Sequence, residues 1–321
     1  MSQPVAATWM SVELKALPLL RKYAVVCGLV LLLIAAAIWA PGFYTRSTLR
    51  NTTQQASLIG IVALGQFLVL MIRGIDLSIP AVVGFTAVLV ADRGPGSTPG
   101  VLLSIAIALS VACLNSYLVI RRNVPPFVAT FGMAVVLAGL QLTYTKGGAS
   151  GSTDSAIVTI GQGAIFGVNY STWVWLVLAL LTSQFLYRTT YGRRMVMAGS
   201  NPQMAKLSGV RVGRYVLGAF VASALLALLC ALFTAGSTGY VDRFMGLGTD
   251  LDSLTIALIA GSRFSGGEGS IVSVIAGSLL LASLLTLIVL LGWNAELQLI
   301  AKGVVLISAI ALQSLARNRA A

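Results

Sequence analysis

Long apolar runs separated by short polar segments make up most of the chain. Because a membrane-crossing helix needs roughly 20 apolar residues, runs that approach this length are candidate spans. In chain order, the candidates are Tyr23–Ala40, Ala56–Ile72, Leu77–Ala91, Val101–Ile120, Pro126–Tyr144, Thr172–Tyr187, Tyr215–Ala235, Leu251–Ser262, Ile271–Leu291 and Leu297–Leu315. The pattern therefore predicts an all-α integral membrane protein with about ten transmembrane helices.

The composition supports a membrane protein and excludes several other classes. Hydrophobic residues make up 57% of the chain and charged residues only 9%, with a mean hydropathy of +0.93, whereas a soluble domain is about one quarter charged. The net charge of +12 does not indicate nucleic-acid binding, because the basic residues lie in short clusters between apolar runs. The chain has no histidine, and its three cysteines match no metal-binding spacing, so we expect no metal or other cofactor.

The distribution of lysine and arginine predicts the topology. If the N-terminus lies inside and the spans alternate, most basic residues fall in cytoplasmic segments, as the positive-inside rule requires. An even number of spans then places both termini in the cytoplasm. The alternative is eight spans, if the two shortest runs do not cross. The predicted organisation is a cytoplasmic N-terminal segment (1–22), a single transmembrane domain (23–315) with a cytoplasmic basic loop (188–214), and a cytoplasmic tail (316–321).

Two predicted spans, Leu77–Ala91 and Leu251–Ser262, are too short to cross the membrane comfortably. They are the third spans of two five-span halves, and each follows a similar segment. These segments are Gly74-Ile75-Asp76-Leu77-Ser78 and Gly248-Thr249-Asp250-Leu251-Asp252-Ser253. Since each half has an odd number of spans, a duplication would be inverted. Short segments in matching places of two halves are typical of a solute pathway, so the sequence is compatible with a 5+5 inverted repeat.

Asp76 allows two interpretations. A carboxylate at the mouth of a span is costly in lipid and normally faces protein or water. In the structural interpretation, Asp76 and Ser78 accept hydrogen bonds from free N–H groups at the start of the next helix, and Gly74 permits the turn. In the functional interpretation, the same residues line or gate a pathway. The sequence leaves both open.

The basic loop contains a predicted short helix. Ser200 or Asn201 is the candidate N-cap, Pro202 the first helical residue and Gly209 the stop signal. A helix of about two turns is marginal alone, so it packs either on the lipid surface or on a cytoplasmic partner. A second loop, Gly261–Gly269, is rich in glycine but lacks the Gly-Lys-Ser/Thr sequence of a phosphate-binding loop. We therefore expect no nucleotide hydrolysis by that route.

Four stretches of the chain carry a family resemblance. They are Gly74–Ser78, Pro126–Met133, Tyr191–Val210, and Asp250–Asp252 followed by Gly266-Gly267. In this order and spacing they resemble the permease subunits of bacterial ABC importers for ribose and related monosaccharides, from about Tyr23 to Leu315. The resemblance implies a non-enzymatic subunit of the bacterial cytoplasmic (inner) membrane that translocates a monosaccharide or similar small polar solute by alternating access. The domain over 23–315 would then be the permease domain.

The resemblance also implies partners and site residues. The partners are a cytoplasmic ABC ATPase, usually of two fused nucleotide-binding domains, a periplasmic or lipid-tethered solute-binding protein, and a second permease copy or a related chain. The implied pathway or gate residues are Arg73, Gly74, Asp76, Ser78, Phe127, Thr130, Asp250 and Asp252. The residues implied to couple to the ATPase are Gly192, Arg193, Arg194, Asn201, Ala205, Leu207 and Gly209.

The chain departs from the family pattern at several positions. The family usually has a small residue where Arg73 stands, Val-Gly-Ser where this chain has Ile79-Pro80-Ala81, and Glu-Leu-Asp where it has Asp250-Leu251-Asp252. These differences leave the expected architecture intact and the solute undetermined.

Three other functions are alternatives. An ion-coupled secondary transporter would place carboxylates mid-membrane, whereas the acids here fall in loops or near span ends. A passive solute channel would need no docking helix. An intramembrane enzyme could use Lys302, which lies within the last predicted span, as a base, but a lysine that snorkels or pairs with another helix is the simpler interpretation.

Overall fold

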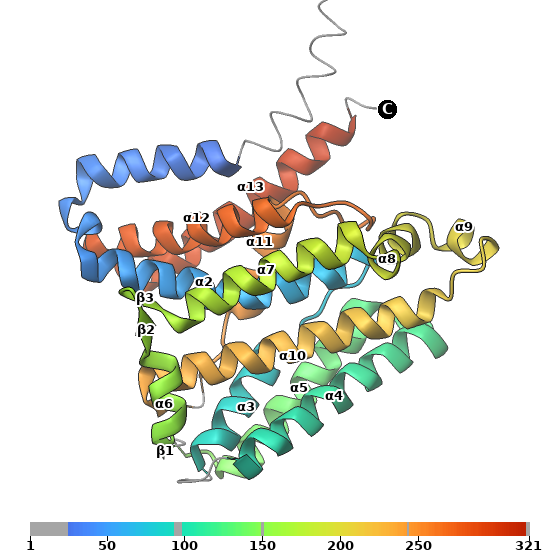
Figure 1. The fold of residues 1–321 in the computed structure, drawn as a ribbon, viewed down its shortest axis with the longest axis horizontal. Coiled ribbons are helices and arrows are strands. Elements are labelled where there is room, and N and C mark those ends of the chain that lie inside the picture. Colours follow the sequence, from blue (N-terminus) through green and yellow to red (C-terminus); the bar gives the residue numbers. More distant parts are fainter. Residues whose placement is uncertain (1–24, 93–97, 149–150, 243, 319–321) are drawn as a thin grey trace, which may run out of the picture.

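The computed structural model describes residues 25–92, 98–148, 151–242 and 244–318 (Figure 1). The predicted N-terminal segment (1–22) and residues 319–321 of the predicted tail lie outside this range. Helices account for most of the described chain. They are α2 (Arg46–Met71), α3 (Ile79–Asp92), α4 (Thr98–Arg121), α5 (Pro126–Thr145), α6 (Ser155–Gln162), α7 (Tyr170–Arg188), α8 (Thr190–Ser200), α9 (Pro202–Leu207), α10 (Val212–Thr238), α11 (Thr249–Ile259), α12 (Ile271–Leu290) and α13 (Ala295–Asn318).

An apolar helix over Val25–Trp39 and the 3-10 turn η1 (Pro41–Tyr44) precede α2. The strands are only two residues long and form two antiparallel pairs. They are β1 (Gly151–Ser152) with β4 (Tyr240–Val241), and β2 (Ala164–Ile165) with β3 (Val168–Asn169). These strand pairs connect loops, and the packed core consists of helices.

Each predicted span coincides with a helix, so the prediction of an all-α membrane protein is confirmed. Within the described residues, α2, α4, α5, α10 and α12 are long and apolar enough to cross a membrane. The number of crossings and the side on which the termini lie stay predictions. The largest boundary difference is at α2, which begins at Arg46 rather than Ala56. Thr45 caps this helix through a bond from the Thr48 N–H, and the polar residues that follow continue it.

Two segments that separate predicted spans contain further helices. After α5, the Asp154 carboxylate caps α6 by accepting a hydrogen bond from the Ala156 N–H at 2.8 Å. A Cβ on Gly161 of α6 would lie 2.3 Å from the backbone of Gly236, so α6 meets α10 backbone to backbone. In the basic loop, α8 precedes the predicted short helix α9. With 8 and 11 residues, α6 and α8 are too short to register as spans.

The two long helices α2 and α10 lie against each other at the centre of the molecule (Figure 1). In addition, α2 packs on α11 and α12, while α10 packs on α3 and α4. The short helices have matching neighbours, because α3 contacts α4 and α5 just as α11 contacts α12 and α13. These contacts repeat between the two halves with the central helices exchanged, a pattern that is compatible with a five-span duplication.

Small residues permit the close approach of α2 and α10. A Cβ on Gly65 would lie 2.9 Å from the Ser223 Cα, which is too close for any side chain there. Elsewhere on the same interface, the Cys230 thiol donates to the Leu58 carbonyl at 3.4 Å. Small residues are how membrane helices bring their backbones together, because lipid provides no hydrophobic force between them.

We expect Gly65→Ala to lower the free energy of unfolding by about 1–3 kcal/mol, the usual cost of overpacking, because the added methyl group forces α2 away from α10. Thermal unfolding in detergent would show a lower midpoint. Gly139→Ala on α5 is the matched control, since a Cβ at that glycine has nothing within 4 Å and alanine favours a helix. Equal midpoints for the two variants would contradict the close-packing argument.

Candidate functional site

The backbone leaves helical geometry between α2 and α3, over residues 72–78, which we call the α2–α3 joint. The Arg73 N–H donates to the Leu70 carbonyl at 3.0 Å and the Gly74 N–H to the Val69 carbonyl at 2.8 Å, which closes the end of α2. A Cβ on Gly74 would lie 2.7 Å from the Val69 side chain, which explains the glycine. Non-helical backbone that is buried among helices needs further partners for its polar groups.

Buried side chains supply several of these partners. The Asp76 N–H donates to the Gln66 side-chain oxygen at 3.3 Å, and the Ser78 N–H donates to the Asp76 carboxylate at 2.9 Å. From α5, the Thr130 hydroxyl donates to the Ile75 carbonyl at 3.1 Å. All four of these polar side chains are almost fully buried. The joint is therefore a polar cluster enclosed by the helical core.

Asp76 also ties the joint to the central helix α10. Its second carboxylate oxygen accepts a hydrogen bond from the Ser223 hydroxyl at 2.8 Å, while the Ser78 hydroxyl donates to the first. The Asn115 amide of α4 donates to the Ser78 hydroxyl oxygen at 3.2 Å. With Asp76 only 3% exposed, this geometry favours the structural interpretation. The carboxylate bonds the N–H of Ser78, just before α3, rather than an N–H within α3.

Helices α8 and α9 form a projecting end of the molecule, with α9 beyond the ends of α7 and α10 (Figure 1). Asn201 caps α9 by accepting a bond from the Met204 N–H at 3.0 Å, and Pro202 is the first helical residue. These predicted positions are confirmed. Ser200, the other candidate cap, is instead the last residue of α8. Gly209 follows α9 with a φ of +75°, a conformation that suits the predicted stop.

The predicted coupling residues fall into buried and exposed groups. Gly192 and Ala205 are buried, and a Cβ on Gly192 would lie 2.1 Å from a backbone oxygen of α7. Arg193, Arg194 and Leu207 are exposed, with Leu207 at 83%. The exposed residues lie on α8 and α9, the helices of the projecting end. The buried residues hold α8 and α9 against the helices that carry them.

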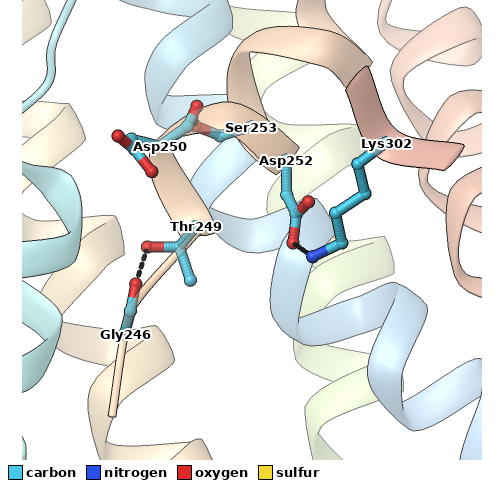
Figure 2. A network of polar contacts seen from close by, with 6 residues as sticks. All are labelled: Gly246, Thr249, Asp250, Asp252, Ser253 and Lys302. Atoms are coloured by element: carbon cyan, nitrogen blue, oxygen red, sulfur yellow. Dashed lines mark hydrogen bonds and ion pairs between the residues drawn. The ribbon is translucent and has the colours of Figure 1, made fainter. Parts of the chain in front are cut away.

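The second short helix, α11, holds a buried ion pair (Figure 2). The Lys302 ammonium of α13 lies 2.8 Å from the Asp252 carboxylate, and the two side chains are 19% and 7% exposed. Asp250 and Asp252 both lie in the first turn of α11, where the helix dipole favours carboxylates. Just before them, the Thr249 hydroxyl donates to the Gly246 carbonyl at 2.7 Å. Lys302 is therefore paired with another helix, as the simpler interpretation expected.

The predicted pathway residues occupy different places. Phe127 lies on the exposed face of α5, where its ring stacks on Phe131 with 6.1 Å between centroids. The Asp252 carboxylate of α11 pairs with Lys302 rather than with the joint. The loop before α11 reaches α3. There, a Cβ on Gly246 would lie 2.6 Å from the Pro80 carbonyl oxygen. The residues that meet at the joint are Arg73, Gly74, Asp76, Ser78 and Thr130.

Sequence reasoning missed three residues of the polar cluster, Gln66, Asn115 and Ser223. Each is a polar residue inside an apolar run, which was the signal that could have found it. That signal is not selective, however, because other polar residues in these runs bond only their own helix. The hydroxyl of Ser116, for example, donates to the Ala112 carbonyl at 2.7 Å.

Comparisons with known proteins identify relatives of the whole helical region. Residues 48–310 match the family model described as branched-chain amino acid transport system / permease component. The ribose import permease protein of Escherichia coli K12 is 29% identical over 300 residues, covering 91% of this chain and 93% of that protein. The galactose/methyl galactoside import permease protein of the same organism is 29% identical over 308 residues, covering 89% and 92%.

A third relative is the fructose import permease protein of Rhizobium meliloti, 30% identical over 308 residues and covering 91% of this chain and 85% of that protein. No solved structure matches the chain. The described helices that carry the joint and the ion pair lie almost entirely within the matched region.

We expect Lys302→Leu to destabilise the protein by about 3–5 kcal/mol, because it leaves the Asp252 carboxylate buried and uncompensated. A chemical or thermal denaturation series in detergent measures the loss. The double variant Asp252→Asn with Lys302→Leu removes both charges and should recover most of the lost stability. If the single variant were as stable as the double one, the ion pair would not be the reason for the lysine.

Proposed function

The chain belongs to the family described as branched-chain amino acid transport system / permease component, and from that premise we propose that it is the permease subunit of an ATP-driven ABC importer for a monosaccharide or similar small polar solute. It is a multi-pass protein of the bacterial inner membrane. The names of the ribose, galactose and fructose permeases support the sugar class, because each relative matches about nine tenths of the chain.

The exposed helix α9 is the observation that carries the coupling part of the proposal. Met204 and Leu207 are 58% and 83% exposed there, within a basic segment (188–214) that contains no acidic residue. A six-residue helix of this kind gains little stability by itself. Its place beyond the ends of α7 and α10 (Figure 1) favours contact with a cytoplasmic partner over contact with lipid. We therefore propose that α9, together with Arg193 and Arg194, contacts an ATPase.

Under this proposal the chain contributes alternating access, while the ATPase, with two nucleotide-binding domains in one chain, supplies the energy. A solute that binds both orientations equally shifts nothing, so the ATPase biases the orientation through α8 and α9. A solute-binding protein delivers the solute from outside. A second permease copy or a related chain completes the pathway.

The short helices α3 and α11 and the α2–α3 joint are the parts that we assign to the pathway. The joint has hydrogen-bonding groups to spare, because Gln66 Nε2 and Asn115 Oδ1 are buried and have no partner among the described residues. The proposed pathway or gate residues are Arg73, Gly74, Asp76, Ser78, Phe127, Thr130, Asp250 and Asp252.

The test is to purify the tagged chain from membranes of its own host and to measure ATP hydrolysis by the purified complex. Uptake of radiolabelled ribose, galactose, fructose and leucine is then compared between cells with and without the chain. Leucine tests the solute that the family description names. The proposal expects a complex that hydrolyses ATP and a chain-dependent uptake of one sugar. Chain-dependent uptake without any associated ATPase would support the ion-coupled or channel alternatives.

We expect the double charge reversal Arg193→Glu with Arg194→Glu to lower uptake at least about tenfold, the factor that corresponds to 1.4 kcal/mol of lost docking energy. The chain should still insert, because other basic clusters set the topology. Reversal of Arg121 and Arg122, at the end of α4 and also to glutamate, is the matched control and should retain uptake. Immunoblots of membranes verify equal insertion.

Gly209→Pro should have the same effect as the Arg193 and Arg194 reversal. Proline fixes φ near −65°, whereas Gly209 has a φ of +75° and donates its N–H to the Lys206 carbonyl at 3.0 Å. The substitution therefore displaces α9 without touching the spans. Wild-type uptake by both the proline variant and the double reversal would refute docking through α8 and α9.

A further inference from the structure

Arg73 has an unusual backbone conformation at the start of the α2–α3 joint. Its φ is +64°, in the left-handed region that residues with a side chain rarely adopt. Nothing in the turn itself requires an arginine, because the hydrogen bonds that close α2 come from backbone N–H groups. An explanation for the residue must therefore come from its side chain.

The Arg73 guanidinium binds the end of α8. Its Nε donates to the Gly199 carbonyl at 2.6 Å and its Nη2 donates to the Ser200 carbonyl. These are the last two residues of α8, whose terminal carbonyls have no partner within the helix. A positive charge is favourable at this end of a helix dipole, and the planar guanidinium can serve both carbonyls at once.

The backbones at the ends of α2 and α8 pack closely beside Arg73. A Cβ on Gly199 would lie 1.8 Å from the Met71 carbonyl oxygen, at the end of α2. The same oxygen accepts a hydrogen bond from the Gly267 N–H at 2.9 Å. A Cβ on Gly266 would meet the Arg73 side chain at 2.6 Å. The end of α8, the end of α2 and the turn before α12 therefore form one three-way contact, in which Arg73 provides the side-chain tether.

We propose that Arg73 is a positioning residue that transmits movement of α8 and α9 to the α2–α3 joint. The proposal rests on the proposed function, because the movement originates in the ATPase that α9 contacts. The movement of α9 reaches Arg73 through α8, whose last carbonyls, on Gly199 and Ser200, accept hydrogen bonds from the guanidinium. Arg73 lies three residues before Asp76 in the joint. The hydrogen bond from Ser223 to Asp76 then links the joint to α10. The structure thus links the cytoplasmic docking helix to the buried polar cluster by hydrogen bonds and backbone packing.

The experiment measures whether the joint responds to nucleotide. A thiol is introduced by Leu77→Cys in a chain whose native cysteines are replaced by alanine, and the permease–ATPase complex is placed in lipid nanodiscs. The rate of maleimide labelling is compared without nucleotide and after trapping with ATP and vanadate. With Arg73 present, we expect trapping to change the labelling rate several-fold.

Arg73→Gly is the decisive variant, because glycine accepts the left-handed backbone and removes only the tether. It should retain ATPase binding and reduce the nucleotide-dependent change in labelling several-fold, with the remainder carried by the backbone contacts of Gly199 and Gly267 with Met71. Arg73→Lys keeps the charge but cannot bond both carbonyls in the planar geometry, so its response should be intermediate. Arg263→Gly is the matched control, since Arg263 lies in the neighbouring turn and pairs with exposed Glu268 at 3.0 Å.

The outcomes separate this inference from the proposed function. If the chain with Arg73 binds no ATPase, the proposed function itself fails. If it binds the ATPase but the joint never responds to nucleotide, or if Arg73→Gly responds like the parent, the relay is refuted and the proposed function stands. Loss of the complex in both Arg73→Gly and Arg73→Lys would also refute the relay, because Arg73 would then serve assembly.

Discussion

The contact between α2 and α10 determines where every other buried helix can lie. Gly65 and Ser223 bring the two backbones together, and each helix then holds the short helix and a neighbour from the opposite half. In lipid, helices associate through packing and hydrogen bonds rather than through hydrophobic force. A single close contact between small residues can therefore organise the whole bundle, and the two halves are interlocked rather than placed side by side.

That same contact creates the conditions for the α2–α3 joint. Because α10 approaches α2 so closely, the Ser223 hydroxyl reaches the Asp76 carboxylate, and the non-helical backbone of the joint finds partners that lipid could not give. Asp76 and Ser78 lie in the joint itself, while Gln66, Asn115 and Thr130 come from three neighbouring helices. The unwound segment is thus possible only as part of the assembled bundle, which couples its geometry to the packing of the central pair.

The sequence was sufficient for the long apolar helices, for the short helices α3 and α11 and for the capped helix α9, because these depend on apolar length and on local capping residues such as Asn201. It did not predict α6 and α8, which are short. It was insufficient for the polar cluster. Whether Ser223 bonds a distant carboxylate or a carbonyl of its own helix depends on which helix lies opposite, and spacing along the chain does not encode that. The pairing of Asp252 with Lys302 has the same origin, since two residues far apart in sequence meet only through the packing of α11 on α13.

The buried carboxylates of the two matching segments, Asp76 before α3 and Asp252 in α11, are stabilised in different ways. Asp252 is neutralised by a cation, and separating that pair would leave two buried charges, which is costly. Asp76 is held by hydroxyl and N–H donors, and no ion pair involves it within the described residues. Hydrogen bonds from such donors can be exchanged one at a time, at about 1.5–3 kcal/mol each when the acceptor is charged. Under the proposed function, the α2–α3 joint therefore rearranges during transport, whereas the contact between α11 and α13 stays fixed. Arg73 connects the cytoplasmic end of the molecule to the joint.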